Sequence, residues 1–319
     1  MASSIFSSDK RVHLTILTAL ASVAIFMLVN TGTYLYDAAK KDGVRAENIF
    51  WDRKIAPGEK YEIVFLGDSR CLTGLVPSIF SNTLQKSSFN GSFAGGGLNS
   101  FIFTHTEKNI LKNDDSLRCI ILSVTPLAMS KKARENENYH SIVKRMQENA
   151  TFYDRICNIV FRRVASKESA RFSGERKDRL FFHSDGYLEC MENVREDVQK
   201  RNIRGYREYF RTMEFAPESL QEILSFTEKW RKENILVFAF RPPTTSGMEA
   251  LENEMGKCDF SIVKTMFENA GGIWLDVPER EKYNAYDASH LGSGESRKLS
   301  ADLAEKVKEH IRQRSNSFR

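Results

Sequence analysis

A serine, a histidine and an aspartate occur where a hydrolytic site could form. Ser69 follows the apolar run EIVFL in the tripeptide Gly67-Asp68-Ser69, so it occupies the turn that leaves a buried strand. A serine in such a turn has an exposed hydroxyl with backbone N–H groups nearby. The alternative is an ordinary turn in which Asp68 or Ser69 caps the next helix.

The second element is the tetrapeptide Asp287-Ala-Ser-His290, which precedes the last predicted helix. Two intervening residues allow the carboxylate to orient the imidazole, so that Nε2 can take a proton from Ser69. By itself, this tetrapeptide fits equally well a turn that contains Asp287 and a surface position for His290. Together, the two elements predict a nucleophile, a base and an orienting carboxylate, which is the chemistry of acyl transfer. No GxSxG motif occurs, which argues against the nucleophile turn of α/β-hydrolases.

Alternating strands and helices must position these residues. Short, continuous apolar strands separated by helical patterns predict an α/β fold with a parallel sheet covered on both faces. Ligands of such sheets bind outside the carboxyl ends of the strands, which is where Ser69 lies. The predicted strands are 62–66, 88–93, 119–124, 235–240 and 272–277, and the predicted helices are 77–85, 98–111, 217–233, 260–269 and 294–312.

GDS after the first strand and DxxH before the last helix resemble the SGNH (GDSL-type) hydrolase family, a three-layer α/β/α fold. The resemblance implies a discontinuous SGNH-like domain over 61–126 and 217–316. The run Asn90-Gly-Ser-Phe-Ala-Gly95 is similar to the family's second block, N-x-x-x-x-G. The resemblance therefore implies Ser69 as nucleophile and first oxyanion donor, Gly95 as second donor, His290 as base and Asp287 as its partner.

One departure from the family pattern concerns the third strand. Free esterases of the family carry an asparagine in a G-x-N-D block there, but this strand ends in Ser123-Val-Thr-Pro126. Loss of one oxyanion donor costs about 10²–10³ in rate. Arg70, Thr125 and Arg241 are the candidates for a compensating or substrate-binding role, because each follows a predicted strand. For Arg241, an ion pair that fixes its loop is an equally good interpretation.

The N-terminal region predicts a membrane anchor. Residues 14–36 carry no charged side chain and, at about 1.5 Å per residue, span about 35 Å, enough for one bilayer crossing. We therefore expect a cytoplasmic stub at 1–13, the anchor at 14–36, a stalk at 37–60 and an extracytoplasmic body. A cleaved signal peptide is the rival interpretation. Basic residues flank the segment on both sides, so charge alone leaves the orientation open.

The segment 127–216 interrupts the α/β pattern and reads as a mostly helical insertion. It holds 19 Lys and Arg against 14 Asp and Glu, a surplus equal to the net charge of +5 of the whole chain. An anionic polymer or lipid headgroup is one partner that such a surplus favours, and a solvated helical surface is the alternative.

The composition excludes several classes of protein. A mean hydropathy of −0.42 excludes a polytopic membrane protein, and the small net charge does not indicate nucleic-acid binding. The five cysteines form no CxxC pair and no His-paired spacing, so we expect neither a metal site nor a bound cofactor.

The anchor, GDSR and the run SVTPLAMSKKARENENY resemble the membrane-anchored DltD-like and alginate-acetylation-like branch of the SGNH proteins. This resemblance implies a serine esterase or O-acyltransferase that acts on acyl esters, most simply acetyl, of an envelope or exported polysaccharide. The alternative is a catalytically weak accessory module that binds polysaccharide or a membrane acyltransferase. The missing third-block asparagine motivates that alternative.

Overall fold

The computed structural model describes residues 15–26, 47–55, 57–114, 116–135, 179–277 and 279–317. Contacts divide the chain into two units, Met1–Lys41 with Arg145–Arg176, and Asp42–Lys144 with Lys177–Arg319. In the first unit the structure describes one exposed helix, 15–26. Within the described ranges, no helix combines the length and the apolar character that a bilayer crossing requires. Residues 1–14, 27–46 and 56 of the predicted stub, anchor and stalk, and 136–178 of the predicted insertion, lie outside the described residues.

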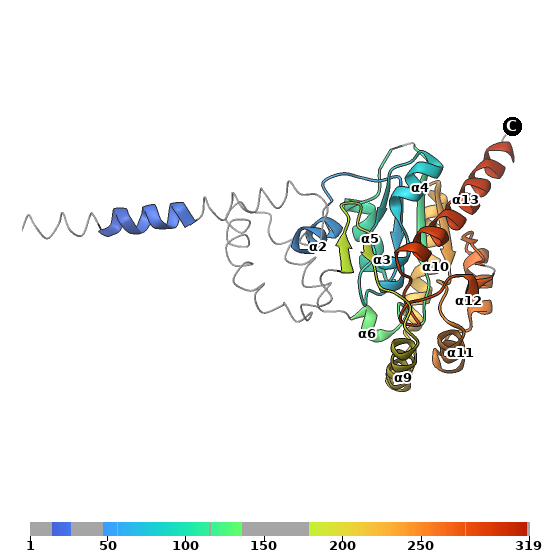
Figure 1. Ribbon diagram of the computed structural model, residues 1–319. Helices are drawn as coiled ribbons and strands as arrows, with labels where there is room; N and C mark the ends of the chain where they lie inside the picture. The colour runs from blue at the N-terminus through green and yellow to red at the C-terminus, as the bar shows by residue number, and fades with distance from the viewer. Residues whose placement is uncertain are drawn as a thin grey trace, which may run out of the picture. The chain divides into compact units, whose positions relative to one another are not determined.

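The second unit is built on a parallel sheet, which confirms the predicted α/β fold (Figure 1). Five strands lie in the order β2-β1-β3-β6-β7, and every neighbouring pair is parallel. The central strands are buried along almost their whole length, since helices cover both faces. The strands are β1 (Ile63–Leu66), β2 (Ser88–Asn90), β3 (Arg118–Ser123), β6 (Ile235–Phe240) and β7 (Ile273–Trp274).

Two groups of helices sandwich this sheet. Alternate residues of β1, β3 and β6 share a core with Phe80 of α4 and with Leu303 and Val307 of α13. The intervening residues, such as Val64 and Ile120, are also buried and lie on the other face. One group is α3 (Ser69–Gly74), α4 (Pro77–Leu84) and α13 (Ser293–Ser317), and the other is α5 (Ser100–Asn109), α10 (Pro217–Lys232) and α12 (Phe260–Asn269).

The described part of the predicted insertion contains a short strand hairpin beside its helices. It contains α6 (Lys131–Arg134), a hairpin of β4 (Leu180–Phe182) and β5 (Leu188–Cys190), and α9 (Glu196–Thr212), which packs against α11 (Ser246–Met255). The sequence did not predict the hairpin, because its strands are only three residues long, too short for a periodic signal.

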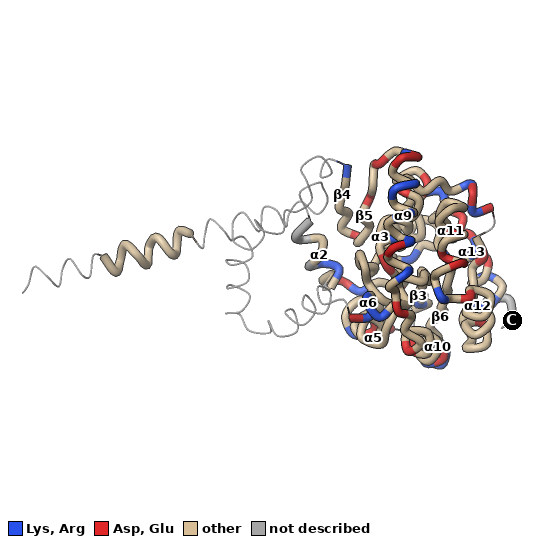
Figure 2. The backbone as a smooth tube through the Cα atoms, turned by 90° about the horizontal axis from the view of Figure 1, so that it is seen from below, with Lys and Arg blue, Asp and Glu red and all other residues tan. Residues whose placement is uncertain are grey.

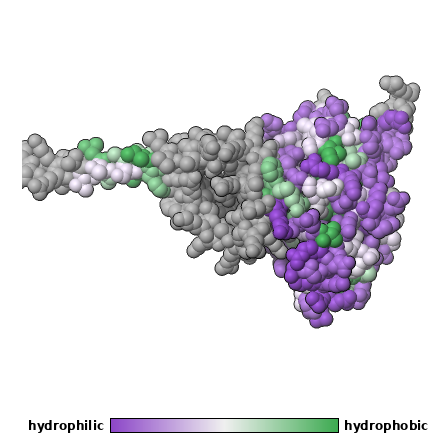
Figure 3. All heavy atoms as spheres, in the orientation of Figure 1, coloured by the Kyte–Doolittle hydropathy of each residue, from purple (hydrophilic) through white to green (hydrophobic). Residues whose placement is uncertain are grey.

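Charges on α9 are largely paired rather than gathered into one basic face. Lys200 lies 3.5 Å from Glu196, and Arg211 lies 2.8 Å from Glu208. In Figure 2 basic and acidic residues alternate over the body, and the face of the body shown in Figure 3 is mostly hydrophilic. For this helix the arrangement is that of a solvated surface.

Part of the predicted stalk is a helix packed on the body. In α2 (Glu47–Ile55), Phe50 shares a core with Leu72 of α3 and Phe182 of β4. Lys54 is fully buried, and its Nζ donates to the carbonyl of Asn90 at 2.6 Å. Burial holds the pKa of Lys54 well below its usual value, despite nearby carboxylate and thiol groups. Residues 47–55 therefore form part of the folded domain instead of an extended connection.

Candidate active site

The turn after β1 presents Ser69. Asp68 caps α3, since its Oδ1 accepts the N–H of Arg70 at 2.9 Å, and Ser69 is the first residue of that helix. A Cβ on Gly67 would lie 2.8 Å from the Cβ of Ser123, so the neighbouring strand requires glycine there. The capping role that sequence analysis offered as an alternative is therefore present, and it coexists with a hydroxyl that faces His290.

Ser69, His290 and Asp287 form one chain of hydrogen bonds. The hydroxyl of Ser69 lies 2.7 Å from Nε2 of His290, and Nδ1 of the same ring lies 2.9 Å from Oδ2 of Asp287. The other carboxylate oxygen of Asp287 accepts the backbone N–H groups of Ser289 at 3.0 Å and His290 at 2.8 Å. These distances suit a nucleophile, a base and an orienting carboxylate.

Asp287 is held in its anionic form. Burial acts to raise the pKa of this carboxyl, but the hydrogen bonds from the His290 ring and from the backbone N–H groups of His290 and Ser289 outweigh burial and lower it below its usual value. A carboxylate that accepts from Nδ1 leaves Nε2 free of its proton in the neutral ring. Nε2 is then able to accept the proton of Ser69.

The site lies where the direction of the sheet connections reverses. From β1 the chain crosses to β2 at one edge, and from β3 it crosses to β6 on the other side. The carboxyl ends of β1 and β3 therefore flank the topological switch point, outside which doubly wound sheets usually bind their ligands. Ser69 follows β1 and Thr125 follows β3.

Gly95 borders a pocket of about 490 Å³ together with Ser69. The N–H of Gly96 donates to the carbonyl of Phe93 at 3.0 Å and closes a turn. Gly95 is the third residue of that turn and has a φ of +66°, which glycine adopts without strain. The pocket is lined by Asp68, Ser69, Gly95, Gly96, Leu127, Lys132, Ala133, Glu135, Tyr206 and Tyr209.

Asn90, the first residue of the motif that contains Gly95, supports the nucleophile helix. Its Nδ2 donates to the carbonyls of Cys71 at 2.9 Å and Leu75 at 3.0 Å, near the end of α3. Its Oδ1 accepts the N–H of Ser92 at 3.1 Å. Asn90 thereby ties α3 to β2 and fixes the helix that begins with Ser69.

Two residues predicted to contact substrate are buried in the body. Thr125 has no exposed surface, and its hydroxyl donates to Oδ2 of Asp68 at 2.5 Å. Arg70 is only 3% exposed; its Nε donates to the Ser289 hydroxyl at 2.8 Å and its Nη1 pairs with Glu252 at 2.5 Å. Both residues bond to neighbouring segments of the site, and neither lines the pocket beside Ser69.

Arg241 forms the ion pairs that sequence analysis offered as its alternative role. Its guanidinium lies 3.0 Å from Glu252 and 3.5 Å from Glu249, and it stacks on the ring of Phe260 at 4.1 Å. It does not line the pocket beside Ser69. The structure therefore assigns Arg241 to the packing of α11 and not to the pocket.

The inserted segment supplies one wall of the pocket, which sequence analysis missed. Tyr206 and Tyr209 lie at i and i+3 on α9, and Nζ of Lys132 lies 5.1 Å from the ring centroid of Tyr209. The same helix holds the histidine loop, since Asn202 donates to the carbonyl of Asp287 at 3.1 Å. The spacing of the two tyrosines is a weak sequence signal for this pocket wall, because aromatic residues three apart on a helix more often pack in a core.

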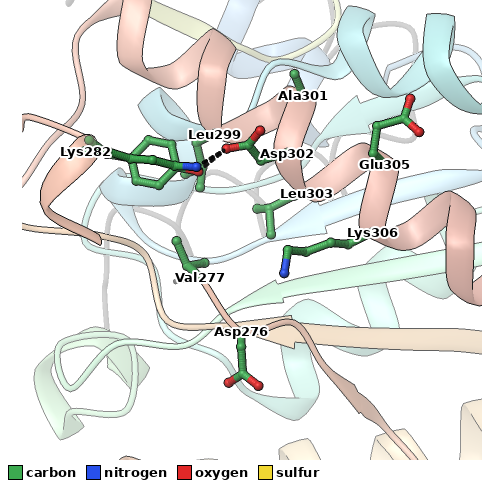
Figure 4. Close-up of a pocket in the computed structure, with 10 residues that line it drawn as sticks. Asp276, Val277, Lys282, Leu299, Ala301, Asp302, Leu303, Glu305 and Lys306 are labelled. Carbon is green, nitrogen blue, oxygen red and sulfur yellow. Dashed lines mark hydrogen bonds and ion pairs between the residues drawn. The ribbon is translucent and has the colours of Figure 1, made fainter. Parts of the chain in front are cut away.

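A second pocket, of about 330 Å³, lies between α13 and the loop after β7 (Figure 4). Lys282 pairs there with Asp302 at 3.0 Å, and the Tyr283 hydroxyl also donates to Asp302. This pocket shares no lining residue with the pocket of Ser69. We therefore take the Ser69 pocket as the candidate active site.

Comparison with known proteins returns no assignment: no protein-family model matches the sequence, and no curated protein matches it.

Proposed function

We propose that this chain is an SGNH-type serine esterase or O-acyltransferase. The observation that carries the proposal is the hydrogen-bonded chain from Ser69 through His290 to Asp287 at the carboxyl end of β1. The resemblance of the GDS and DxxH motifs supports the same family and the three-layer α/β/α form of its fold. In this proposal 61–126 and 217–316 form the SGNH-like domain, and the segment between them is an insertion.

The reaction begins when Oγ of Ser69 attacks the acyl carbonyl carbon and His290 Nε2 takes the hydroxyl proton. Asp287 stabilises the resulting imidazolium. The N–H groups of Ser69 and Gly95 donate to the developing oxyanion. When the tetrahedral intermediate collapses, His290 returns the proton to the leaving alkoxide oxygen and an acyl-Ser69 ester remains. Water or a sugar hydroxyl then attacks that ester by the same proton transfers, giving hydrolysis or acyl transfer.

The proposed substrate is an acyl ester, most simply acetyl, of an envelope or exported polysaccharide. Tyr206 and Tyr209 offer aromatic faces to a sugar ring, while Lys132 and Glu135 offer a donor and an acceptor to hydroxyl groups. About 490 Å³ is a volume typical of small-molecule sites. The reaction as written uses no metal and no cofactor.

We further propose that residues 14–36 anchor the protein in a membrane with the body extracytoplasmic. The uncharged segment of the sequence supports this placement. Fusions at the C-terminus test it: alkaline phosphatase activity together with a dark green fluorescent protein is expected. Fluorescence without phosphatase activity would place the body in the cytoplasm.

The second candidate is an accessory module that binds polysaccharide or a membrane acyltransferase. Among the described residues that line the pocket there is no asparagine, so the third oxyanion donor of the family's esterases has no counterpart in the lining. Complementation of a deletion separates the candidates. Ser69→Ala and His290→Ala fail to complement if the chain is an enzyme, and both complement fully if binding is the function.

A further inference from the structure

A second hydrogen bond joins the two loops that carry Ser69 and His290. Arg70 follows Ser69, Ser289 precedes His290, and the Nε of Arg70 donates to the Ser289 hydroxyl at 2.8 Å. Ser69 and His290 face each other at 2.7 Å, so each loop contributes two adjacent residues to a pair of contacts. Arg70 and Ser289 are 3% and 1% exposed, respectively.

Arg70 is itself held in place from a third element. Its Nη1 lies 2.5 Å from Oε1 of Glu252, which is completely buried on α11. The other oxygen of Glu252 accepts from Arg241 at 3.0 Å. A planar guanidinium that uses Nε and Nη1 for two different partners has little rotational freedom left. The bond from Arg70 to Ser289 therefore has a fixed direction.

Ser289 connects that arginine with both the triad and the pocket. Its backbone N–H donates to Oδ1 of Asp287 at 3.0 Å. Burial raises the pKa of Tyr206, which lines the pocket beside Ser69, and the nearby Arg70 and Ser289 act in the opposite direction. Ser289 thus contacts the orienting carboxylate and the residue after the nucleophile, and it lies near the wall supplied by α9.

We infer that Arg70 and Ser289 are positioning residues that hold Ser69 Oγ in line with His290 Nε2. The inference rests on the proposed function, since it concerns the same reaction. Neither Arg70 nor Ser289 lines the pocket beside Ser69. We therefore expect their loss to slow the chemical step and to leave substrate binding unchanged. A displacement of about 1 Å at a reacting pair costs about 10²-fold in rate.

The test measures kcat and KM for p-nitrophenyl acetate in the wild type, Ser289→Ala, Arg70→Lys and the double variant. Lysine keeps the charge that faces Glu252, but its single nitrogen cannot occupy the positions of both Nε and Nη1. Each single variant is expected to lower kcat about 10- to 100-fold with KM changed less than about twofold. The double variant falls no further than the lower single variant, because both changes break one contact.

Thr227→Val is the control. Thr227 is completely buried on α10, and its hydroxyl donates to the carbonyl of Ile223 at 2.7 Å. The control loses a buried hydrogen bond in the helix layer that contains neither α3 nor α13, and its kcat is expected to equal that of the wild type. An equal loss in Thr227→Val would make the effect one of general stability and overturn the inference.

Three further outcomes separate this inference from the proposed function. Wild-type kcat in both Ser289→Ala and Arg70→Lys overturns the positioning role and leaves the enzyme proposal intact. Multiplying losses in the double variant also overturn it, because independent effects do not share one contact. A wild-type protein that neither turns over the ester nor reacts with a fluorophosphonate at Ser69 overturns the proposed function itself. Arg70→Lys decides the question on its own if Ser289→Ala does not fold.

Discussion

Ser69 Oγ and His290 Nε2 lie 2.7 Å apart although 221 positions separate the two residues in the chain. The packing of α13 against α3 creates this proximity. At the start of α13 the Ser296 hydroxyl donates to the carbonyl of Thr73 in α3 at 2.6 Å. Because α3 begins with Ser69 and α13 follows His290, docking of the two helices closes the site.

Asp287→Asn is expected to lower kcat on the order of 10⁴-fold while the protein remains folded. The amide can still accept the backbone N–H groups through one oxygen, but it cannot stabilise the imidazolium. Steady-state kinetics with an aryl acetate, together with circular dichroism, measure both properties. Asp276→Asn is the control, since exposed Asp276 pairs with half-buried Lys264 at 2.7 Å and lies outside the Ser69 pocket. Activity of Asp287→Asn equal to that of the control would contradict the assigned role.

Thr125→Val is expected to lower the free energy of unfolding by about 2 kcal/mol. The change preserves shape but removes the hydroxyl that donates to buried Asp68 and accepts the N–H of Ala128. Urea unfolding measures the loss. Thr265→Val on the exposed side of α12 serves as control and is expected to change stability little. Equal stability of the two variants would show that the Thr125 hydroxyl does not support the nucleophile turn.

Lys132→Met is expected to lower kcat/KM about tenfold for an acetylated oligosaccharide and to leave p-nitrophenyl acetate hydrolysis unchanged. The reason is that Lys132 lines the pocket wall, where the proposed substrate would place its sugar and not its acyl carbon. Lys131→Met is a matched control, because the neighbouring Lys131 is exposed and pairs with Glu214 at 2.5 Å. An identical effect of both substitutions on the oligosaccharide would argue for general surface charge instead of a pocket contact.

Glu62 gives stability a defined dependence on pH. Burial acts to raise the pKa of its carboxyl, but hydrogen bonds from Lys86 and Ser87 outweigh burial and lower the pKa to about 2. A depressed folded-state pKa stabilises the protein above the usual carboxyl range, and the stabilisation is lost as pH falls toward 2. Glu62→Gln is therefore expected to destabilise at pH 7 and progressively less between pH 4.5 and 2. A difference in unfolding free energy that stays constant over this range would contradict the assignment.

Sequence patterns were sufficient for the sheet and for the proximity of Ser69, His290 and Asp287. Each strand is a continuous apolar run, which is typical of a sheet covered on both faces. The predicted bounds of all five strands lie within a few residues of the observed bounds. Ser69 and His290 were recognisable because the local motifs carry their own turn chemistry. Asp68 and Asp287 each bond to backbone N–H groups two residues ahead, which is information contained in a few adjacent residues.

The pocket wall could not be predicted, because it depends on contacts between distant segments. Arg70, Thr125 and Arg241 were expected near substrate on the grounds that they follow strands, but the sequence does not show which way a side chain points. Glu252 lies 182 positions from Arg70 in the numbering, and without that partner the burial of Arg70 has no sequence signal. The short β4–β5 hairpin was missed for the same reason, since its strands are specified by packing.

The most direct test of the central claim is mass spectrometry of the purified protein after reaction with a fluorophosphonate. We expect one covalent adduct, on the peptide that contains Ser69, and its absence in Ser69→Ala. We also expect labelling at least about 10³-fold slower in His290→Ala, since the base is removed. An unlabelled wild type, or equal labelling of Ser69→Ala, would contradict the claim that Ser69 is an activated nucleophile.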